Sequence, residues 1–199
     1  SLGGRTLHLM KAESPGPIVS KLVPKSSQSS KILYGIYCAM TLAQIFLLRL
    51  TGMPWYDSIV NSFATAGTGG FAVKNISIGA YGNPAAEIVI TVFMLLFSVN
   101  FSVYFLILCG KVRQALRSDE LRFFLGVVAA STVLIAVNIH GMFDTVGETV
   151  RHSAFQVASI ISTTGFASTD FNLWPEFSKT VLVLLMFIGA CAGSTGGAI

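Results

Sequence analysis

Two short loops rich in glycine and threonine contain the residues best suited to chemistry in this sequence. They are Thr68-Gly69-Gly70-Phe71 and Thr163-Thr164-Gly165-Phe166. Each follows a short amphipathic segment, at residues 55–66 and 150–162, and each is flanked by apolar runs long enough to cross a bilayer. Irregular backbone at membrane depth is tolerated only where protein buries it or where it lines a watery cavity. The pattern predicts two re-entrant pore loops, whose backbone carbonyls can replace the hydration shell of an ion.

The two loops occupy the same position in an internal repeat. A shift of 95 residues makes Thr68 coincide with Thr163 and Gly70 with Gly165. Repeats of this kind reveal architecture and are best sought first. In both copies one apolar run precedes the loop and another follows, which a chance likeness between two glycine-rich turns does not explain. Each unit is therefore predicted to consist of a span, a pore helix, a filter loop and a second span.

Composition places the chain among polytopic membrane proteins with an all-α fold. Hydrophobic residues make up 53% of the chain and charged residues only 11%, whereas soluble domains carry about 25% charged residues. The net charge of +4 is assigned to loops facing the cytoplasm and requires no nucleic acid. The chain opens at Ser1 rather than at Met and stops inside an apolar segment. We therefore expect the sequence to be part of a longer protein.

Four apolar runs are predicted as spans, at residues 32–50, 84–109, 123–139 and 179–188. The predicted domains are a cytoplasmic linker at 1–31, one unit at 32–110, a cytoplasmic connector at 111–122, and a second unit at 123–199 that is truncated in its inner helix. The linker and the connector region hold nine of the thirteen Lys and Arg residues. The positive-inside rule places them in the cytoplasm, so the filter loops are expected to open outward.

A glycine-rich segment interrupts the last apolar run. It reads Gly189-Ala190-Cys191-Ala192-Gly193-Ser194-Thr195-Gly196-Gly197. Each glycine costs a helix up to about 1 kcal/mol relative to alanine, so this span is predicted to break near the middle of the bilayer. The matching stretch of the earlier unit, Met94–Ser102, has no glycine and is expected to continue as helix. The segment could be a mobile gate below the filter, or small residues that allow close helix packing; both interpretations stay open.

Together these motifs resemble the Trk/Ktr/HKT superfamily of potassium transporters, most closely its TrkH/KtrB-type membrane subunits. The resemblance is carried by Gly52-Met53-Pro54, Ala66–Phe71, Asn100-Phe101, Ser162–Phe166 and Gly189–Gly197, with Gly3–Thr6 and Lys11–Glu13 in addition. It implies four span–pore helix–span units with pseudo-fourfold symmetry around one pore. This chain would then hold the second unit and most of the third.

The resemblance also implies roles for individual residues. The K⁺ filter would comprise Gly67, Thr68, Gly69, Gly70 and Phe71 together with Ser162, Thr163, Thr164, Gly165 and Phe166. The carbonyls that bind K⁺ would be those of Thr68, Gly69, Gly70, Thr163, Thr164 and Gly165. The gate loop would be Gly189, Ala190, Cys191, Ala192, Gly193, Ser194, Thr195, Gly196 and Gly197. Asn100 is expected either to bond a neighbouring helix or to line the cavity.

The function implied by the resemblance is that of the membrane subunit of a potassium uptake system. It would be a multi-pass protein of the bacterial inner membrane that transports K⁺, has no covalently bound cofactor and is not an enzyme. Its expected partners are the lipid bilayer, a second copy in a homodimer, and a TrkA/KtrA-type cytoplasmic subunit that binds nucleotides. The alternatives are a Na⁺-permeable or cation-coupled symporter of the same superfamily, a polytopic membrane enzyme, and a membrane scaffold. An enzyme would need clustered His, Asp, Ser or Cys near an interface, and the sequence offers no such cluster.

Acidic residues also gather on the predicted outer side. They are Asp57, Asp144, Glu148, Asp170 and Glu176. Such charges can concentrate cations at a pore mouth, but we interpret them mainly as solvated loop charges.

Overall fold

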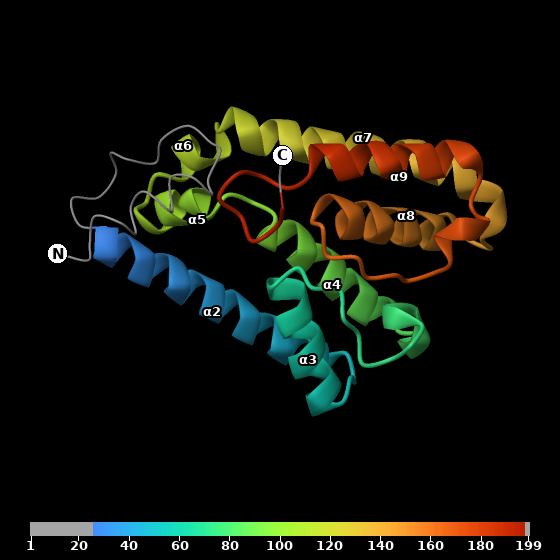
Figure 1. Ribbon diagram of the computed structural model, residues 1–199, viewed down its shortest axis with the longest axis horizontal. Helices are drawn as coiled ribbons and strands as arrows, with labels where there is room; N and C mark the ends of the chain where they lie inside the picture. Colours follow the sequence, from blue (N-terminus) through green and yellow to red (C-terminus); the bar gives the residue numbers. More distant parts are fainter. Residues whose placement is uncertain (1–25, 198–199) are drawn as a thin grey trace.

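The computed structural model describes residues 26–197, and the regular elements within this range are all helices (Figure 1). Most of the predicted cytoplasmic linker, with Gly3–Thr6 and Lys11–Glu13, lies outside the described residues, as do Ala198 and Ile199. Residues 26–31 form the start of helix α2 (Ser26–Leu50). The first helix is therefore longer at its N-terminal end than the predicted span, whereas the part of it that could cross a bilayer is Lys31–Leu50.

The first pore helix has the predicted bounds. Helix α3 spans Trp55–Ala66 and begins directly after Pro54, whose missing N–H and fixed φ suit the start of a helix. The turn before it uses Gly52, which has a φ of +94°. Gln44 on α2 donates a hydrogen bond of 2.9 Å to the hydroxyl of Thr65 on α3. This buried contact fixes the pore helix against the first span.

The second span is not continuous, and the prediction of one helix over residues 84–109 is wrong. Helix α4 (Pro84–Phe97) and helix α5 (Phe101–Leu108) meet at 89°. Neither glycine nor proline stands at the break, which lies at residues 98–100. The Ser98 hydroxyl bonds back to the Met94 carbonyl at 2.7 Å, and the Asn100 side chain caps α5 by accepting from the Ser102 N–H at 2.9 Å.

The second unit follows a short connector. Helix α6 (Val112–Leu116) leads to α7 (Asp119–Ile139), which begins before the predicted third span, and then to the one-turn 3-10 helix η2 (His140–Met142). The second pore helix is α8 (Val146–Ile161), and its filter loop leads through η3 (Phe171–Leu173) to α9 (Glu176–Ile188). Helix α9 ends at Gly189, as the glycine-rich segment predicts.

The helices that could cross a bilayer number two within the described residues, or three if the bent pair counts as one span. They are Lys31–Leu50, Asp119–Met142 and the pair formed by α4 and α5. Helix α9 holds 13 residues, which is too short for the roughly 20 residues that a complete span requires.

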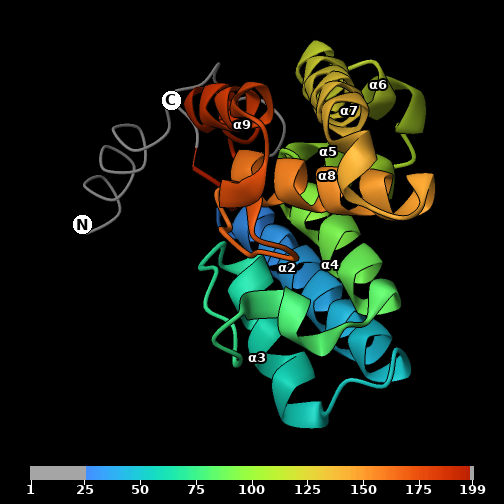
Figure 2. The ribbon, with the colours of Figure 1, turned by 90° about the vertical axis from the view of Figure 1, so that its right-hand side faces the viewer.

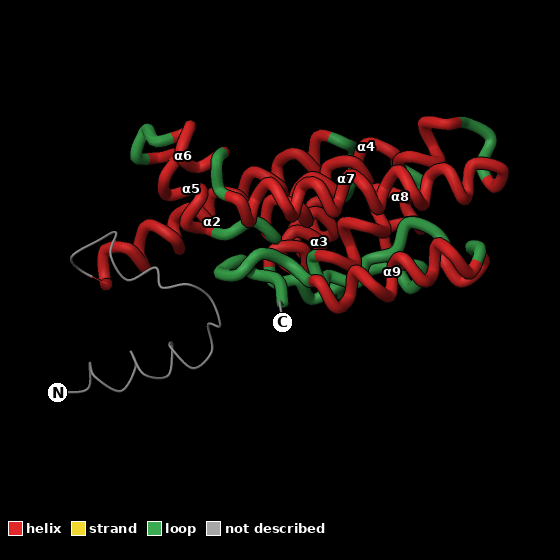
Figure 3. The backbone as a smooth tube through the Cα atoms, turned by 90° about the horizontal axis from the view of Figure 1, so that it is seen from above, coloured by secondary structure: helices red, strands yellow, loops and turns green. Residues whose placement is uncertain are grey.

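The two units pack directly against each other. Figure 2 shows α7, α8 and α9 gathered above α2, α3 and α4, and α7 and α8 run side by side (Figure 3). Helix α4 of the first unit contacts α8 of the second, where Ile90 and Met94 share a buried cluster with Phe155 and Ala158. Burial of this apolar surface places the two filter loops next to each other.

Candidate functional site

Both filter loops have the same unusual backbone conformation. The φ angles of Thr68 and Thr163 are +48° and +58°, and those of Gly70 and Gly165 are +69° and +85°. A β-branched residue with positive φ is a conformational outlier. A strained backbone conformation persists only where contacts with the surrounding structure enforce it, and such conformations concentrate at functional sites. Because the outliers occupy equivalent positions, the internal repeat extends to the backbone conformation.

Equivalent hydrogen bonds hold each loop to its pore helix. Gly69 N–H donates to the Ala64 carbonyl at 2.8 Å, and in the second unit Thr164 N–H donates to the Ser159 carbonyl at 3.0 Å. The second loop has extra support, because the Ser159 hydroxyl donates to the Phe166 carbonyl at 2.6 Å. These hydrogen bonds hold each loop against the C-terminal end of its pore helix and fix the direction in which the chain leaves that helix.

The two loops also touch through their backbones. A Cβ atom placed on Gly70 would lie 2.1 Å from the carbonyl oxygen of Thr164. Real Cβ atoms do not approach other atoms so closely, so glycine is required at this point of contact. The predicted K⁺-binding residues Thr68–Gly70 and Thr163–Gly165 are therefore brought together along one shared edge.

The glycine-rich segment after α9 fills the bend between α4 and α5. The backbone N–H of Thr195 donates to the Phe97 carbonyl at 3.2 Å, and that of Cys191 to the Ser98 carbonyl at 3.0 Å. In return, the Phe101 N–H donates to the Gly193 carbonyl at 3.1 Å. These bonds pair the backbone groups that the bend releases, which explains how α4 ends without a helix-breaking residue.

The same segment lies against both filter loops. The Thr68 hydroxyl donates to the Thr195 carbonyl at 3.3 Å, and the Gly197 N–H donates to the Thr163 hydroxyl at 3.0 Å. Gly196 packs so closely that a Cβ atom there would lie 2.9 Å from the Ser162 carbonyl oxygen. A gate below the filter and close packing of small residues are both compatible with this position.

Glu120 holds the segment from its other side. One carboxylate oxygen accepts the Ala192 N–H at 2.7 Å, and the other accepts from the Asn100 side-chain amide at 3.3 Å. Asn100 therefore bonds a neighbouring helix, one of the two roles expected of it. Glu120 was not identified from the sequence, because an acidic residue in the first turn of a helix is ordinarily explained by the helix dipole.

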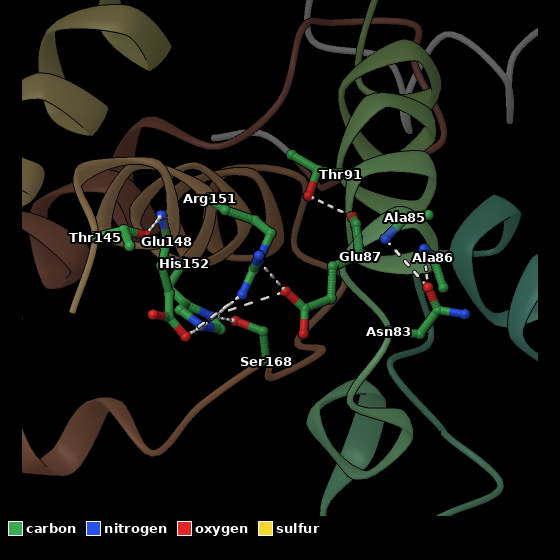
Figure 4. Close-up of polar contacts among 10 residues, drawn as sticks. All are labelled: Asn83, Ala85, Ala86, Glu87, Thr91, Thr145, Glu148, Arg151, His152 and Ser168. Carbon is green, nitrogen blue, oxygen red and sulfur yellow. Dashed lines mark hydrogen bonds and ion pairs between the residues drawn. The ribbon is translucent and has the colours of Figure 1, made fainter. Parts of the chain in front are cut away.

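The sequence analysis also did not identify a polar cluster near the N-terminal ends of α4 and α8. Figure 4 shows Glu87 on α4 facing Arg151 and His152 on α8, with Ser168 beside them. The Arg151 Nε lies 2.8 Å from the Glu87 carboxylate. The available signal was that Glu87 is the only charged residue in the apolar run 84–109. A charge inside a membrane segment calls for a nearby partner.

Asp57 is a further correction to the sequence-based interpretation. It is a buried side chain, 8% exposed, and its carboxylate accepts a 2.7 Å hydrogen bond from the Tyr81 hydroxyl. Burial, together with the hydrogen bond to Asp57, raises the pKa of Tyr81 to about 12. Asp57 thus anchors the loop after the first filter and is not a solvated charge. Asp144, Asp170 and Glu176 are exposed, as expected.

Comparison with known proteins gives consistent matches over nearly the whole chain. The sequence profile of the TrkH family, described as cation transport proteins, matches residues 3–199. The Trk system potassium uptake proteins TrkH of Salmonella typhimurium and Escherichia coli are each 34% identical to it over 200 residues, covering 98% of this chain and 41% of theirs. The crystal structure of the potassium transporter TrkH from Vibrio parahaemolyticus superposes with a TM-score of 0.83 at 29% identity, covering 90% of this chain and 39% of that one. The chain spans about two fifths of the length of these curated relatives.

Proposed function

Because the chain belongs to the TrkH family of cation transport proteins, we propose that it supplies two of the four pore units of a potassium uptake subunit. The units would be residues 32–110 and 123–199, joined by the cytoplasmic connector 111–122. The observation that carries the proposal is the pair of filter loops, which share one strained conformation and meet where Gly70 faces the Thr164 carbonyl. The family is described by cation transport, which supports a transporter over an enzyme.

The environments of two equivalent phenylalanines support a ring of units. Phe166 is 1% exposed and packs with Leu48, Met53 and Ile78 of the preceding unit. Phe71 occupies the same position in the first unit, yet it is 81% exposed. If each filter phenylalanine packs against the unit before it, Phe71 requires one more unit on its open side. This arrangement fits placement of the two units as second and third.

The proposed cargo is K⁺, held by the carbonyls of Thr68, Gly69, Gly70, Thr163, Thr164 and Gly165. Left-handed residues alternating along a short loop can turn successive carbonyls toward one axis, and rings of carbonyls can replace the hydration shell of K⁺. The relatives are named as potassium uptake proteins. This name favours a potassium uptake subunit over a Na⁺-permeable or cation-coupled symporter. Below the filter, Gly189–Gly197 would act as an intramembrane gate loop, whose equilibrium between two arrangements sets the flux.

The proposed setting is the inner membrane of a bacterium, crossed several times. The apolar helices and the family assignment place the chain in a membrane, and the relatives compared above are bacterial. As partners we propose a second copy of the subunit and a TrkA/KtrA-type cytoplasmic subunit that binds nucleotides. The Trk system named for the relatives implies association with further Trk components.

Gly165→Ser in the complete transporter tests the filter. Gly165 has a φ of +85°, and apart from its chain neighbours no atom of the described residues lies within 4 Å of the position of an added Cβ. The change therefore acts through the backbone, where a left-handed conformation costs about 1–2 kcal/mol. We expect the preference for K⁺ over Na⁺ to fall roughly tenfold, since 1.4 kcal/mol corresponds to a factor of ten. This preference is measured as the ratio of K⁺ to Na⁺ uptake by a bacterial strain that lacks its own potassium transporters. An unchanged ratio at normal expression contradicts the filter assignment.

Cysteine labelling tests the orientation. Single cysteines at Asn75 and Asn172, in the loops that leave the two filters, should react with an impermeant thiol reagent added outside the cell. A cysteine at Ser118, between α6 and α7, should react only from the cytoplasmic side of inverted vesicles. This pattern follows from the distribution of Lys and Arg. Reversed labelling would overturn the proposed topology.

A further inference from the structure

The ion pair between Glu87 and Arg151 joins one unit to the pore helix of the next. Glu87 lies in the first turn of α4, and Arg151 lies in the second turn of α8. Their side chains are only 5% and 21% exposed, and Arg151 Nε lies 2.8 Å from Glu87 Oε2. Glu148 is a second, more distant partner of Arg151 at 3.6 Å, with 35% of its side chain exposed. Glu87 is therefore the principal countercharge of Arg151.

The neighbouring residue His152 links this pair to the exit of the second filter. Its ring stacks on Phe143 with the ring centroids 4.9 Å apart, and its Nδ1 lies 2.9 Å from the Ser168 hydroxyl oxygen. Ser168 follows Phe166 by two residues and is itself buried. Because His152 on α8 contacts Ser168, a movement of α8 would displace the backbone that follows the second filter loop.

That backbone is also bonded to the preceding unit. The Ala167 N–H donates to the Ser77 hydroxyl at 3.1 Å, and the Gly79 N–H donates to the Ala167 carbonyl at 3.1 Å. A Cβ atom on Gly79 would lie 2.4 Å from the Ser168 carbonyl oxygen. The backbones of Gly79 and Ser168 are therefore in tight contact. A shift of α8 relative to α4 must therefore strain the second filter loop.

In the first unit, the pore-helix residue equivalent to His152 also binds the loop that follows the filter. Asp57 falls on His152 under the shift of 95 residues, and it anchors its own exit loop through Tyr81. Neither charge of the ion pair is repeated in the other unit, because Tyr56 of the first unit stands at the position equivalent to Arg151, and Leu182 of the second unit at the position equivalent to Glu87.

We propose that Glu87 and Arg151 are positioning residues for ion selection: their largely buried pair holds α8 against α4 and so fixes the geometry of the filter loop at Thr163–Phe166. This inference rests on the proposed transport function and adds residues outside the filter that determine its selectivity. Neither side chain contacts the ion; both act through His152, Ser168 and the backbone after Phe166.

A double-mutant cycle in the complete transporter tests the proposal. Glu87→Gln and Arg151→Gln each leave the other charge, which is largely shielded from solvent, without its principal partner. We expect each to lower the K⁺/Na⁺ uptake ratio at least fivefold. The double variant leaves neither charge unpaired and allows one amide to bond the other, so its ratio should be no lower than that of the worse single variant. Arg151→Lys, which keeps the charge but changes the donor geometry, should lie between wild type and Arg151→Gln.

Glu176→Gln is the matched control, because it breaks an ion pair of 2.6 Å with Lys179 in which the Glu176 side chain is 89% exposed. Exposed pairs contribute little, so its K⁺/Na⁺ ratio should equal that of wild type. Single variants that fold and transport at the wild-type ratio would overturn the proposal, as would an additive double variant. If Glu87→Gln does not fold, Arg151→Lys decides the question. Uptake by the wild type and the effect of Gly165→Ser are measured in the same assay, so failure of the pair is distinguishable from failure of the transport function.

Discussion

Replacing Gly70 by alanine should abolish selective transport, with a larger effect than the same change at Gly165. An added Cβ would lie 2.1 Å from the Thr164 carbonyl oxygen and 3.2 Å from its carbon. Both atoms belong to backbone, so no side-chain rotation can relieve the collision. The left-handed φ of +69° adds its own penalty. Together, overpacking and backbone strain are expected to destabilise the junction of the loops by roughly 2–5 kcal/mol.

Gly165→Ala is the matched control for this prediction. Its φ of +85° imposes the same kind of backbone penalty, but in the part of the chain that the structure describes no atom beyond the neighbouring residues lies within 4 Å of the added Cβ. We expect Gly70→Ala to lose more than nine tenths of K⁺ uptake and to lower the unfolding temperature of the purified transporter. Gly165→Ala should retain most of the uptake, with weakened selectivity. Equal effects at the two positions would show that contact between the loops contributes nothing.

Deleting Ala192–Gly196 from the complete transporter should raise K⁺ flux severalfold and loosen control by the proposed cytoplasmic partner. The deletion removes the hydrogen bonds from Ala192 to Glu120 and from Thr195 to Phe97, and it removes the Thr195 carbonyl that Thr68 contacts. The deletion therefore removes the central part of the segment, whereas Gly197, which donates to the Thr163 hydroxyl, is retained. Selectivity should stay near wild type, because the bonds from the loops to their pore helices remain. Flux in vesicles, with and without the partner, measures the effect.

A milder change tests the same gate without altering the backbone. Glu120→Ala removes the acceptor of the Ala192 N–H and should raise flux in the same direction, by a smaller factor. Cys191 is buried in the proposed gate loop, so faster reaction of its thiol with a cytoplasmic reagent would report that this loop is released. Asp119→Asn, at the exposed acidic residue next to Glu120, is the control and should change neither quantity. Wild-type flux and regulation in a well-folded deletion variant would mean that the segment only packs.

Much of the architecture follows from local patterns in the sequence. The spans are signalled by the length of apolar runs, and α3 has the bounds Trp55–Ala66 because Pro54 starts the helix and a glycine-rich loop ends it. Gly189 ends α9 for the same local reason. The equivalence of the two filter loops is visible because Thr68 and Gly70 recur at a fixed spacing. Each of these features depends on residues close together in the chain.

The tertiary structure alone decided three other features. The bend between α4 and α5 has no local breaker and depends on bonds from Cys191 and Thr195 to the Ser98 and Phe97 carbonyls. The left-handed conformation of the filter threonines is unfavourable for that residue type, so only contacts fixed by the surrounding fold maintain it.

The third feature is the set of distant partners that charged side chains bind. Glu87 pairs with Arg151, 64 residues away, and Glu120 accepts the backbone N–H of Ala192, 72 residues away. Hydropathy, glycine content and repeat spacing are properties of short segments, so the sequence by itself determined where the apolar runs, the first pore helix and the filter loops lie, but not the bend inside residues 84–109. Which distant residue neutralises a buried charge or pairs a free carbonyl depends on how those segments pack, because hydrogen bonds and ion pairs form only at contact distance.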